Sequence, residues 1–162
     1  MNKFTASLFF ILFSWELSSK EILKYNFKNW SGSPLPVFVA KPENINANTR
    51  LVIVMHGRKR NAEEYRDQWI ESSKELNLLV IVPEFSEKNF PEVWGFNYGN
   101  IKTKNLELIP KNLHAFSVIE PLATHALKTF NIKSKNWGIM VTVLELILCI
   151  DLCFIIQNQI IL

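Results

Sequence analysis

The amino-acid sequence predicts an α/β fold for the part of the chain that lies between two apolar ends. Two runs rich in β-branched residues are typical of strands covered on both faces: 51–55, which is continuously apolar, and 78–85, which is apolar up to Pro83. A segment with helical periodicity separates these runs, and the links between the three segments are short. This order of strand, helix and strand is a βαβ unit, which implies parallel strands and a right-handed crossover.

The composition is that of an ordinary globular protein. The 162 residues are 48% hydrophobic and 20% charged, which argues against wholesale disorder, collagen-like repeats and a disulfide scaffold. The length allows one domain of moderate size. Both cysteines, Cys149 and Cys153, lie near the carboxyl end, so the rest of the chain can hold no disulfide. The net charge of +3 is mild and scattered, and it gives little support for a polyanionic partner.

The amino end has the features of a secretory signal peptide. A lone Lys3 precedes an apolar stretch, and the small residues Ser18 and Ser19 follow it. The alternative is a buried first helix, since Lys3 is the only basic flank and Glu16 lies near the expected cleavage site. We expect a signal peptide over residues 1–19 and an exported protein, in the periplasm or the medium.

The elements of the first half follow in a clear order. Residues 35–40 form a short β-type run, and 51–55 form the first buried strand. A helix is expected from Asn61 as its N-cap, with acidic residues in the first turn. The second buried strand, 78–85, is stopped by Pro83. The side chains expected along one face of the helix are Tyr65, Trp69, Ser72 and Leu76.

Residues 86–113 are predicted to be a loop, because glycine and proline recur in them. One interpretation is a surface excursion packed down by its aromatic rings. The other is one wall of a pocket beyond the strand ends, where open α/β sheets bind ligands. The residues proposed for that wall are Trp94, Tyr98 and Asn100.

A second helix and a third strand are expected after this loop. Apolar residues recur at helical spacing over 115–130, and Pro121 within them implies a kink or a helix that starts only there. The run beginning IKSKNWGIM then predicts a third buried strand.

Together these segments resemble the α/β-hydrolase superfamily, in particular secreted esterases similar to polyhydroxybutyrate depolymerases. The resemblance covers residues 35–139, and its most telling part is VMHGRKRNAEEY, in which an apolar strand runs into His-Gly and a polar loop. It implies that His56, Gly57 and Arg58 form an oxyanion-hole loop, with the N–H of Arg58 as a donor and Gly57 allowing close approach. Fixed backbone donors of this kind stabilise the charge of a tetrahedral acyl-transfer intermediate.

The other polar candidates are ordinary. For His56 the resemblance implies an orienting role, and a histidine at a strand end is commonly a structural residue bonded to a neighbouring loop. We expect His114 and His125 to be surface or helix residues, and Glu84 to be a solvated rim charge. The sequence has no HExxH, CxxC or Gly-rich phosphate loop. We therefore expect no metal, no cofactor and no nucleic-acid partner.

The nucleophile expected from the resemblance is missing. Such hydrolases carry G-x-S-x-G on a tight turn after the third of these strands. In this chain no serine or histidine follows Gly138, and the later acid and histidine are absent too. The fold predicted is therefore the amino-terminal part of an α/β-hydrolase, a mostly parallel sheet with flanking helices, which is incomplete.

The apolar tail has two interpretations. Residues 138–162 are long enough to span a bilayer, although Glu145 and Asp151 would lie inside it. Alternatively, one base is missing after Ile139, because the codons from Met140 to Glu145, read one base off, permit Gly-His-Ser-Ala-Gly. We favour the frameshift, which makes 140–162 an out-of-frame tail.

These expectations divide the chain into a signal peptide (1–19), a partial α/β-hydrolase-like domain (20–139) and the tail (140–162). Intact relatives would hydrolyse small or polymeric carboxylic esters through an acyl-enzyme, and this chain would be inactive. The alternative is a non-enzymatic envelope protein whose α/β domain binds a partner and is anchored by residues 138–162. A membrane association would then depend on the tail alone.

Overall fold

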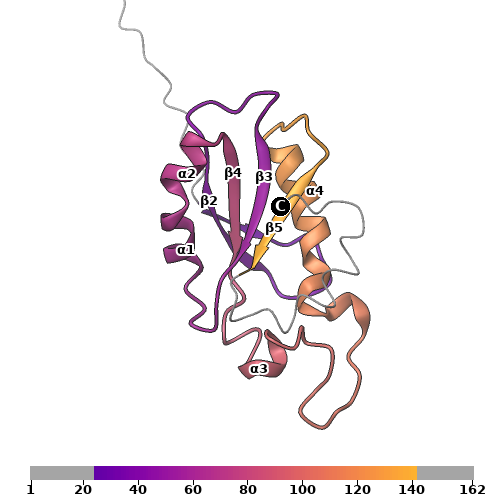
Figure 1. The fold of residues 1–162 in the computed structure, drawn as a ribbon. Helices are drawn as coiled ribbons and strands as arrows, with labels where there is room; N and C mark the ends of the chain where they lie inside the picture. The colour runs from indigo at the N-terminus through magenta and orange to yellow at the C-terminus, as the bar shows by residue number, and fades with distance from the viewer. Residues whose placement is uncertain (1–23, 142–162) are drawn as a thin grey trace, which may run out of the picture.

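The computed structural model describes residues 24–141, which form a three-layer α/β arrangement (Figure 1). A five-stranded sheet has α1 and α2 on one face and α4 on the other. The strands are β1 (Lys24–Phe27), β2 (Leu35–Ala40), β3 (Arg50–Met55), β4 (Leu78–Pro83) and β5 (Trp137–Val141). The helices are α1 (Ala62–Gln68), α2 (Ile70–Glu75), α3 (Glu92–Gly95) and α4 (Ile119–Thr129), with 3₁₀ turns at Lys111–Leu113 and Ala115–Val118.

The strand order is β1-β2-β4-β3-β5, and only part of the sheet is parallel. β3 pairs in parallel with β4 and with β5, as the βαβ pattern predicts. The pairs β1–β2 and β2–β4 are antiparallel, so the sheet of residues 24–141 is partly parallel, where the sequence predicted a mostly parallel one. The physical reason is that the connections from β1 to β2 and from β2 to β3 are both too short for a parallel crossover. Because β2 therefore runs opposite to β3, it also runs opposite to β4, which is parallel to β3.

The core lies on both faces of the sheet, as continuous apolar strands require. The larger cluster packs under α4 and the loop that precedes it, and it includes Leu51, Ile53 and Ile81. The smaller cluster lies under α1 and α2 and includes Val54, Val80 and Val82. Alternate residues of β3 and β4 therefore serve opposite faces, which confirms that these two strands are covered on both sides.

The helix after β3 begins where the sequence indicates but presents a different face. Asn61 occupies the N-cap position, yet its side chain makes no capping hydrogen bond. Tyr65 and Trp69 pack against the smaller cluster as expected. Leu76, in contrast, is 63% exposed, because the second helical segment, α2, ends at Glu75 and the chain turns there towards β4. The fully buried position of α2 is Ser73, whose hydroxyl donates to the carbonyl of Leu78 at 2.8 Å.

Pro121 lies in the first turn of α4 and causes no kink. The helix begins at Ile119, so the missing N–H of Pro121 falls among the amides that have no intrahelical acceptor in any case. Residues 115–118 form a 3₁₀ turn instead of an α-helical one. Of the two predicted outcomes, a helix that starts close to the proline is the correct one.

β5 is the third strand predicted, but it is only partly buried. Its Trp137, Ile139 and Val141 face the larger cluster, while Met140 on the other face is 48% exposed. Within the described part of the chain, no strand pairs with the outer edge of β5. Strand β1 was not predicted at all, because KYNF is short and mixes polar and aromatic residues.

The predicted signal peptide (1–19) and all but the first two residues of the predicted tail (140–162) lie outside the described residues. Met140 and Val141 belong to β5. None of the helices between residues 24 and 141 has the length and apolar character of a membrane span.

Candidate functional site

The candidate site lies where β3 and β4 end, at the edge of the sheet formed by their carboxyl ends. His56 follows β3 directly, and Phe85 comes two residues after β4. Because the two strands are parallel neighbours, the segments that follow them meet at this edge. The turn starting at His56 and the loop starting at Glu84 are joined by hydrogen bonds there.

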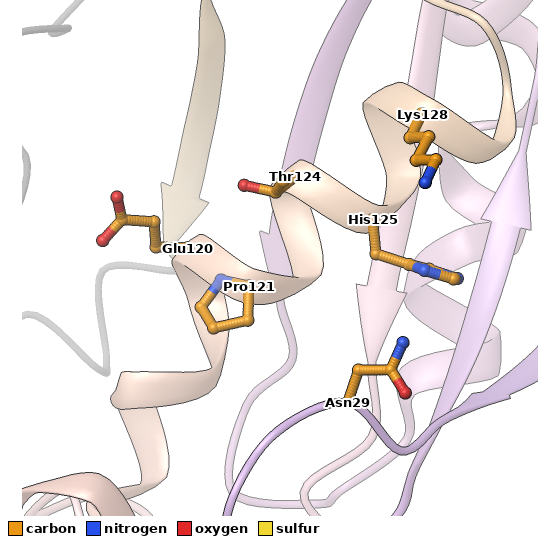
Figure 2. Close-up of a pocket in the computed structure, with 6 residues that line it drawn as sticks. All are labelled: Asn29, Glu120, Pro121, Thr124, His125 and Lys128. Carbon is orange, nitrogen blue, oxygen red and sulfur yellow. The ribbon is translucent and has the colours of Figure 1, made fainter.

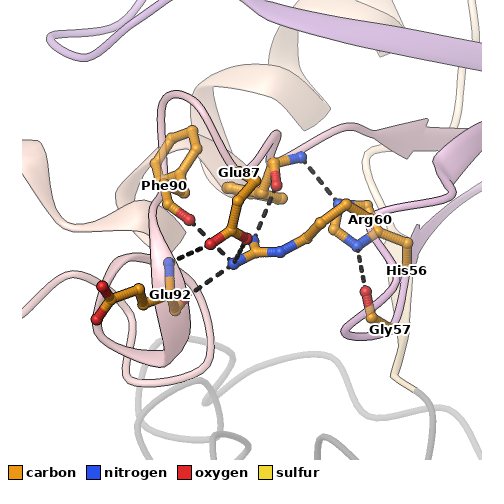
Figure 3. A network of polar contacts seen from close by, with 7 residues as sticks. His56, Gly57, Arg60, Glu87, Phe90 and Glu92 are labelled. Carbon is orange, nitrogen blue, oxygen red and sulfur yellow. Dashed lines mark hydrogen bonds and ion pairs between the residues drawn. The ribbon is translucent and has the colours of Figure 1, made fainter.

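His56 is fully buried and bonded through both ring nitrogens. Its Nε2 accepts from the N–H of Phe85 at 2.8 Å, so this nitrogen carries no proton. Its Nδ1 lies 2.9 Å from the carbonyl oxygen of Gly57, to which it donates. The two contacts specify one neutral tautomer. The imidazole therefore fastens the loop after β4 to the turn after β3 (Figure 3).

Burial lowers the pKa of His56 from 6.5 to about 4. Removal of water from the charged form is the largest cause, and the nearby Arg60 guanidinium acts in the same direction. The hydrogen bond to Gly57 works in the opposite direction but is weaker. A neutral imidazole with both nitrogens engaged is a positioning group and has no free nitrogen to serve as a general base.

Within the described residues, the turn from Gly57 to Arg60 leaves the backbone N–H of Arg58 without a hydrogen-bond acceptor. The carbonyl of Gly57 accepts from the N–H of Arg60 at 3.0 Å as well as from His56. The N–H of Arg58, at the second position of this turn, makes no hydrogen bond within residues 24–141. The Arg58 side chain is exposed. The turn thus holds an unengaged amide at the strand-end edge, which is what an oxyanion hole needs.

Arg60 clamps the loop after β4 to this turn (Figure 3). Its guanidinium donates to the carbonyls of Phe85 at 2.8 Å and of Phe90 and Glu92 at 2.9 Å. It forms an ion pair with Glu87 at 3.3 Å and lies 4.3 Å from the centre of the Phe96 ring. Its backbone has a φ of +58°, in the left-handed region that non-glycine residues rarely occupy.

The sequence analysis did not identify Arg60, because its contacts lie 25 to 32 residues further along the chain. The only signal in the sequence was its place at the end of the polar turn that follows His-Gly.

The pocket-wall residues Trp94, Tyr98 and Asn100 lie together on the loop that contains α3. The rings of Trp94 and Tyr98 are 5.1 Å apart, and Tyr98 is 47% exposed. The Asn100 amide donates to the carbonyl of Leu113 at 3.0 Å and so braces the loop. Phe96, between them, is buried against His56. The loop is therefore packed down by an aromatic ring, and its role as a pocket wall stays a prediction.

Of the remaining candidates, Glu84 adjoins Phe85 at this site, whereas His114 and His125 make their contacts with other segments. Glu84 is half-buried, and its N–H donates to the carbonyl of Pro36. His114 bonds through Nε2 to the carbonyl of Ile109 at 2.9 Å. His125 lies on α4, where its ring contacts Tyr25 and Phe27 of β1. Within the described residues, no group of three His, Cys, Asp or Glu side chains is placed to hold a metal ion.

Comparisons with known proteins found solved structures of similar fold, two of which are described here. Poly(aspartic acid) hydrolase-1 from Sphingomonas sp. KT-1 matches with a TM-score of 0.70 and 34% identity, over 73% of this chain and 45% of its own. LpqC, a poly(3-hydroxybutyrate) depolymerase from Bordetella parapertussis, matches with a TM-score of 0.61 and 21% identity, over 67% of this chain and 37% of its own. No family model matches the chain. No curated protein matches it.

These similarities confirm the resemblance to α/β-hydrolases of the esterase and depolymerase type, together with the α/β fold. The match to the poly(aspartic acid) hydrolase also supports a function of the hydrolase type. The match to LpqC shows the fold alone. The chain spans less than half the length of either protein.

Proposed function

We propose that this chain carries the oxyanion-hole half of an exported hydrolase that cleaves small or polymeric carboxylic esters through an acyl-enzyme. The observation that carries the proposal is the free N–H of Arg58, held at the end of β3 by a turn whose Gly57 carbonyl is bonded twice. The name of the first structural neighbour, a hydrolase of a polymer, adds support for a polymeric substrate.

The geometry suits acyl transfer because the donor is rigid before any substrate arrives. When a nucleophile attacks an ester carbonyl, negative charge develops on the carbonyl oxygen. A backbone N–H that is already fixed stabilises this charge without reorganisation. His56 and Arg60 would act here as positioning residues, since both hold the turn and neither has a free proton-accepting atom.

We further propose that the chain itself does not turn over esters, because residues 139–146, where the elbow of such hydrolases belongs, contain no serine. Purified protein should leave p-nitrophenyl acetate unhydrolysed above the rate of a heat-denatured sample. Clear turnover that a serine-directed phosphonate abolishes would contradict this.

The frameshift hypothesis is tested on the DNA. The bases that span codons 139 to 146, read one base off, should spell Gly-His-Ser-Ala-Gly. Any other translation of those bases contradicts the frameshift.

If the DNA spells the elbow, the oxyanion donor can be tested in the chain with its reading frame restored. Arg58→Pro removes the N–H, and proline suits the second position of this turn. The loss of one such donor should lower kcat by about 10²–10³-fold. Arg58→Ala, which keeps the N–H, is the matched control and should retain activity. Equal activity of the two variants would exclude the Arg58 amide as the donor.

A further inference from the structure

Exposed apolar side chains gather on α3 and on the loop that joins it to α4. Within residues 24–141, six large apolar side chains are clearly exposed, and four of them belong to the sixteen residues 93–108. These four are Val93, Tyr98, Leu106 and Leu108. Exposed apolar residues that occur singly need no explanation, whereas a group of them commonly marks a contact surface.

Leu106 and Leu108 belong to a hairpin within this loop. Lys102 and Leu108 form an antiparallel bridge, and the N–H of Thr103 donates to the carbonyl of Glu107 at 2.9 Å. The N–H of Leu106 donates to the carbonyl of Thr103 at 3.0 Å and closes the turn. These hydrogen bonds join backbone groups, so the two leucine side chains are not needed to close the hairpin.

Leu106 is favoured neither by its backbone conformation nor by its contact with water. Its φ of +65° lies in the left-handed region, which at this place in a hairpin ordinarily selects glycine or asparagine. Its side chain is 64% exposed, so burial within the described residues does not offset the strain. Strained backbone of this kind clusters at functional sites. The described residues give no reason for a leucine at this position, whereas a contact with another molecule does.

The hairpin is a protrusion and not a pocket. Figure 1 shows the chain between α3 and α4 extending beyond the end of the sheet where β3 and β5 finish. The pocket drawn in Figure 2 lies beside α4 and takes none of its lining from residues 93–108. It is lined by Asn29, Glu120, Pro121, Thr124, His125 and Lys128. A protruding apolar tip suits a broad, deformable surface better than a small ligand, which needs a concave site.

The charges around the two leucines favour an anionic surface. Residues 101–111 contain three lysines, Lys102, Lys104 and Lys111, and one acid, Glu107, and all four side chains are exposed. Lys104 forms an ion pair with Glu92 of α3, which neutralises part of its charge. Lysines beside an apolar tip can keep their ammonium groups among lipid headgroups while the apolar side chains lie deeper. A bilayer of anionic lipids offers both an apolar layer and negative headgroups.

We propose that this hairpin inserts Leu106 and Leu108 into the surface of an anionic lipid bilayer, with Lys102 and Lys111 at the headgroups. The contact is peripheral, because each side of the hairpin has only a few residues and is too short to cross a membrane. The inference goes beyond the proposed function, since it needs neither the nucleophile nor the oxyanion turn. It can therefore be measured on the full chain, whether or not that chain hydrolyses esters.

The experiment measures how the full chain partitions onto vesicles that are collected by sedimentation. The probes are vesicles of phosphatidylcholine alone and vesicles of phosphatidylcholine and phosphatidylglycerol in equal amounts. The chain should bind the mixed vesicles more tightly, and this preference should fade as salt is added, because salt screens the lysines. Lys102→Gln should lower the partition onto the mixed vesicles by about 5-fold.

Leu106→Asn separates lipid binding from folding. Asparagine tolerates the left-handed backbone better than leucine, so this variant should be at least as stable to urea as the unchanged protein. It removes one inserted side chain, so its partition onto the mixed vesicles should fall roughly 10-fold. Leu76→Asn is the matched control, since this leucine is 63% exposed and lies just before β4, at the opposite end of the sheet. Its partition should not change.

Four results would overturn the inference. Two are the absence of binding and equal binding to both kinds of vesicle. The third is unchanged binding of Leu106→Asn, which would assign the lipid contact to another part of the chain, such as the apolar tail. The fourth is an equal loss in Leu106→Asn and Leu76→Asn, which would indicate a general effect of surface hydrophobicity. Ester turnover, present or absent, tests the proposed function alone, so the two proposals can fail separately.

Discussion

Arg60 holds a strained backbone in place through contacts made by its own side chain. A left-handed conformation costs a non-glycine residue about 1–2 kcal/mol. Here it directs a largely buried guanidinium at three carbonyls of the loop after β4. A strained conformation of this kind persists where several contacts with the surrounding structure hold it, and it is common beside functional sites. Arg60 therefore ties the two loops at the site into one unit.

Replacement of Arg60 should destabilise the protein. Arg60→Met leaves three carbonyls without their donor, and the free energy of unfolding should fall by about 2–4 kcal/mol. The free energy of unfolding of Arg60→Lys should lie between those of the unchanged protein and Arg60→Met, since an ammonium lacks the planar fork that reaches several carbonyls. Urea unfolding measures both. Arg58→Met, an exposed neighbour, is the control, and equal losses at 58 and 60 would contradict the clamp.

His56 should make the stability of the fold depend on pH. Its imidazole titrates near 6.5 when unfolded and at about 4 when folded, so the unfolded state binds more protons between these values. The free energy of unfolding should therefore fall, by up to about 3 kcal/mol, as the pH drops from 6.5 to 4. Thermal or urea unfolding across this range measures it.

The control for this pH dependence is a second histidine. In His56→Gln, the free energy of unfolding should lose the part of its pH dependence that comes from the buried imidazole. In His114→Gln, that pH dependence should remain. A wild-type slope that survives in His56→Gln would assign the pH dependence to other groups.

The sequence could place the candidate site but could not supply its geometry. The order of elements around His-Gly carried the resemblance that selected His56, Gly57 and Arg58. The tautomer of His56 could not be predicted, because its partner is the amide of Phe85, 29 residues later. The hydrogen bonds of Arg60 could not be predicted either, because its partners lie on a loop whose sequence has no regular hydrophobic pattern.

The short helix α3 depends on a close approach that only glycine permits. A Cβ on Gly95 would lie 2.5 Å from the backbone carbonyl carbon of Phe90, and backbone atoms cannot move aside cheaply. Gly95→Ala should therefore lower the free energy of unfolding by about 1–3 kcal/mol. Gly138→Ala in β5 is the matched control, since its Cβ would meet nothing within 4 Å. Calorimetry compares the unfolding of the two variants. Equal losses of stability would contradict the close approach at Gly95.

The elements that the sequence predicted best are those whose pattern is local. The apolar runs within β3 and β4 predicted buried strands, because no polar side chain interrupts either run. β1 could not be predicted from four residues, because its strand character comes from pairing with β2. The face of the helix after β3 was partly misassigned because α2 ends at Glu75, before Leu76 can reach the core.

Among the described residues, 24–141, no strand pairs with the outer side of β5. No charged residue or proline interrupts Trp137–Val141, and Met140 is exposed on the face beside Val54. Edges of this kind invite pairing with another chain unless a charge blocks it. Met140→Lys should therefore reduce self-association of the full chain, as measured by light scattering. Leu108→Lys, at a residue 76% exposed on a loop, should not. The same reduction in both variants would indicate a general effect of charge.

The position of β5 also sets an order of events during synthesis. The strands β1, β2, β4 and β3 can assemble once Pro83 has emerged from the ribosome, but β3 then forms the edge of that sheet. Its partner on that side ends at Val141, 58 residues later. At ordinary translation rates the ribosome needs about 3 to 12 s for this stretch. For that interval the outer edge of the apolar strand β3 stays open to chaperones.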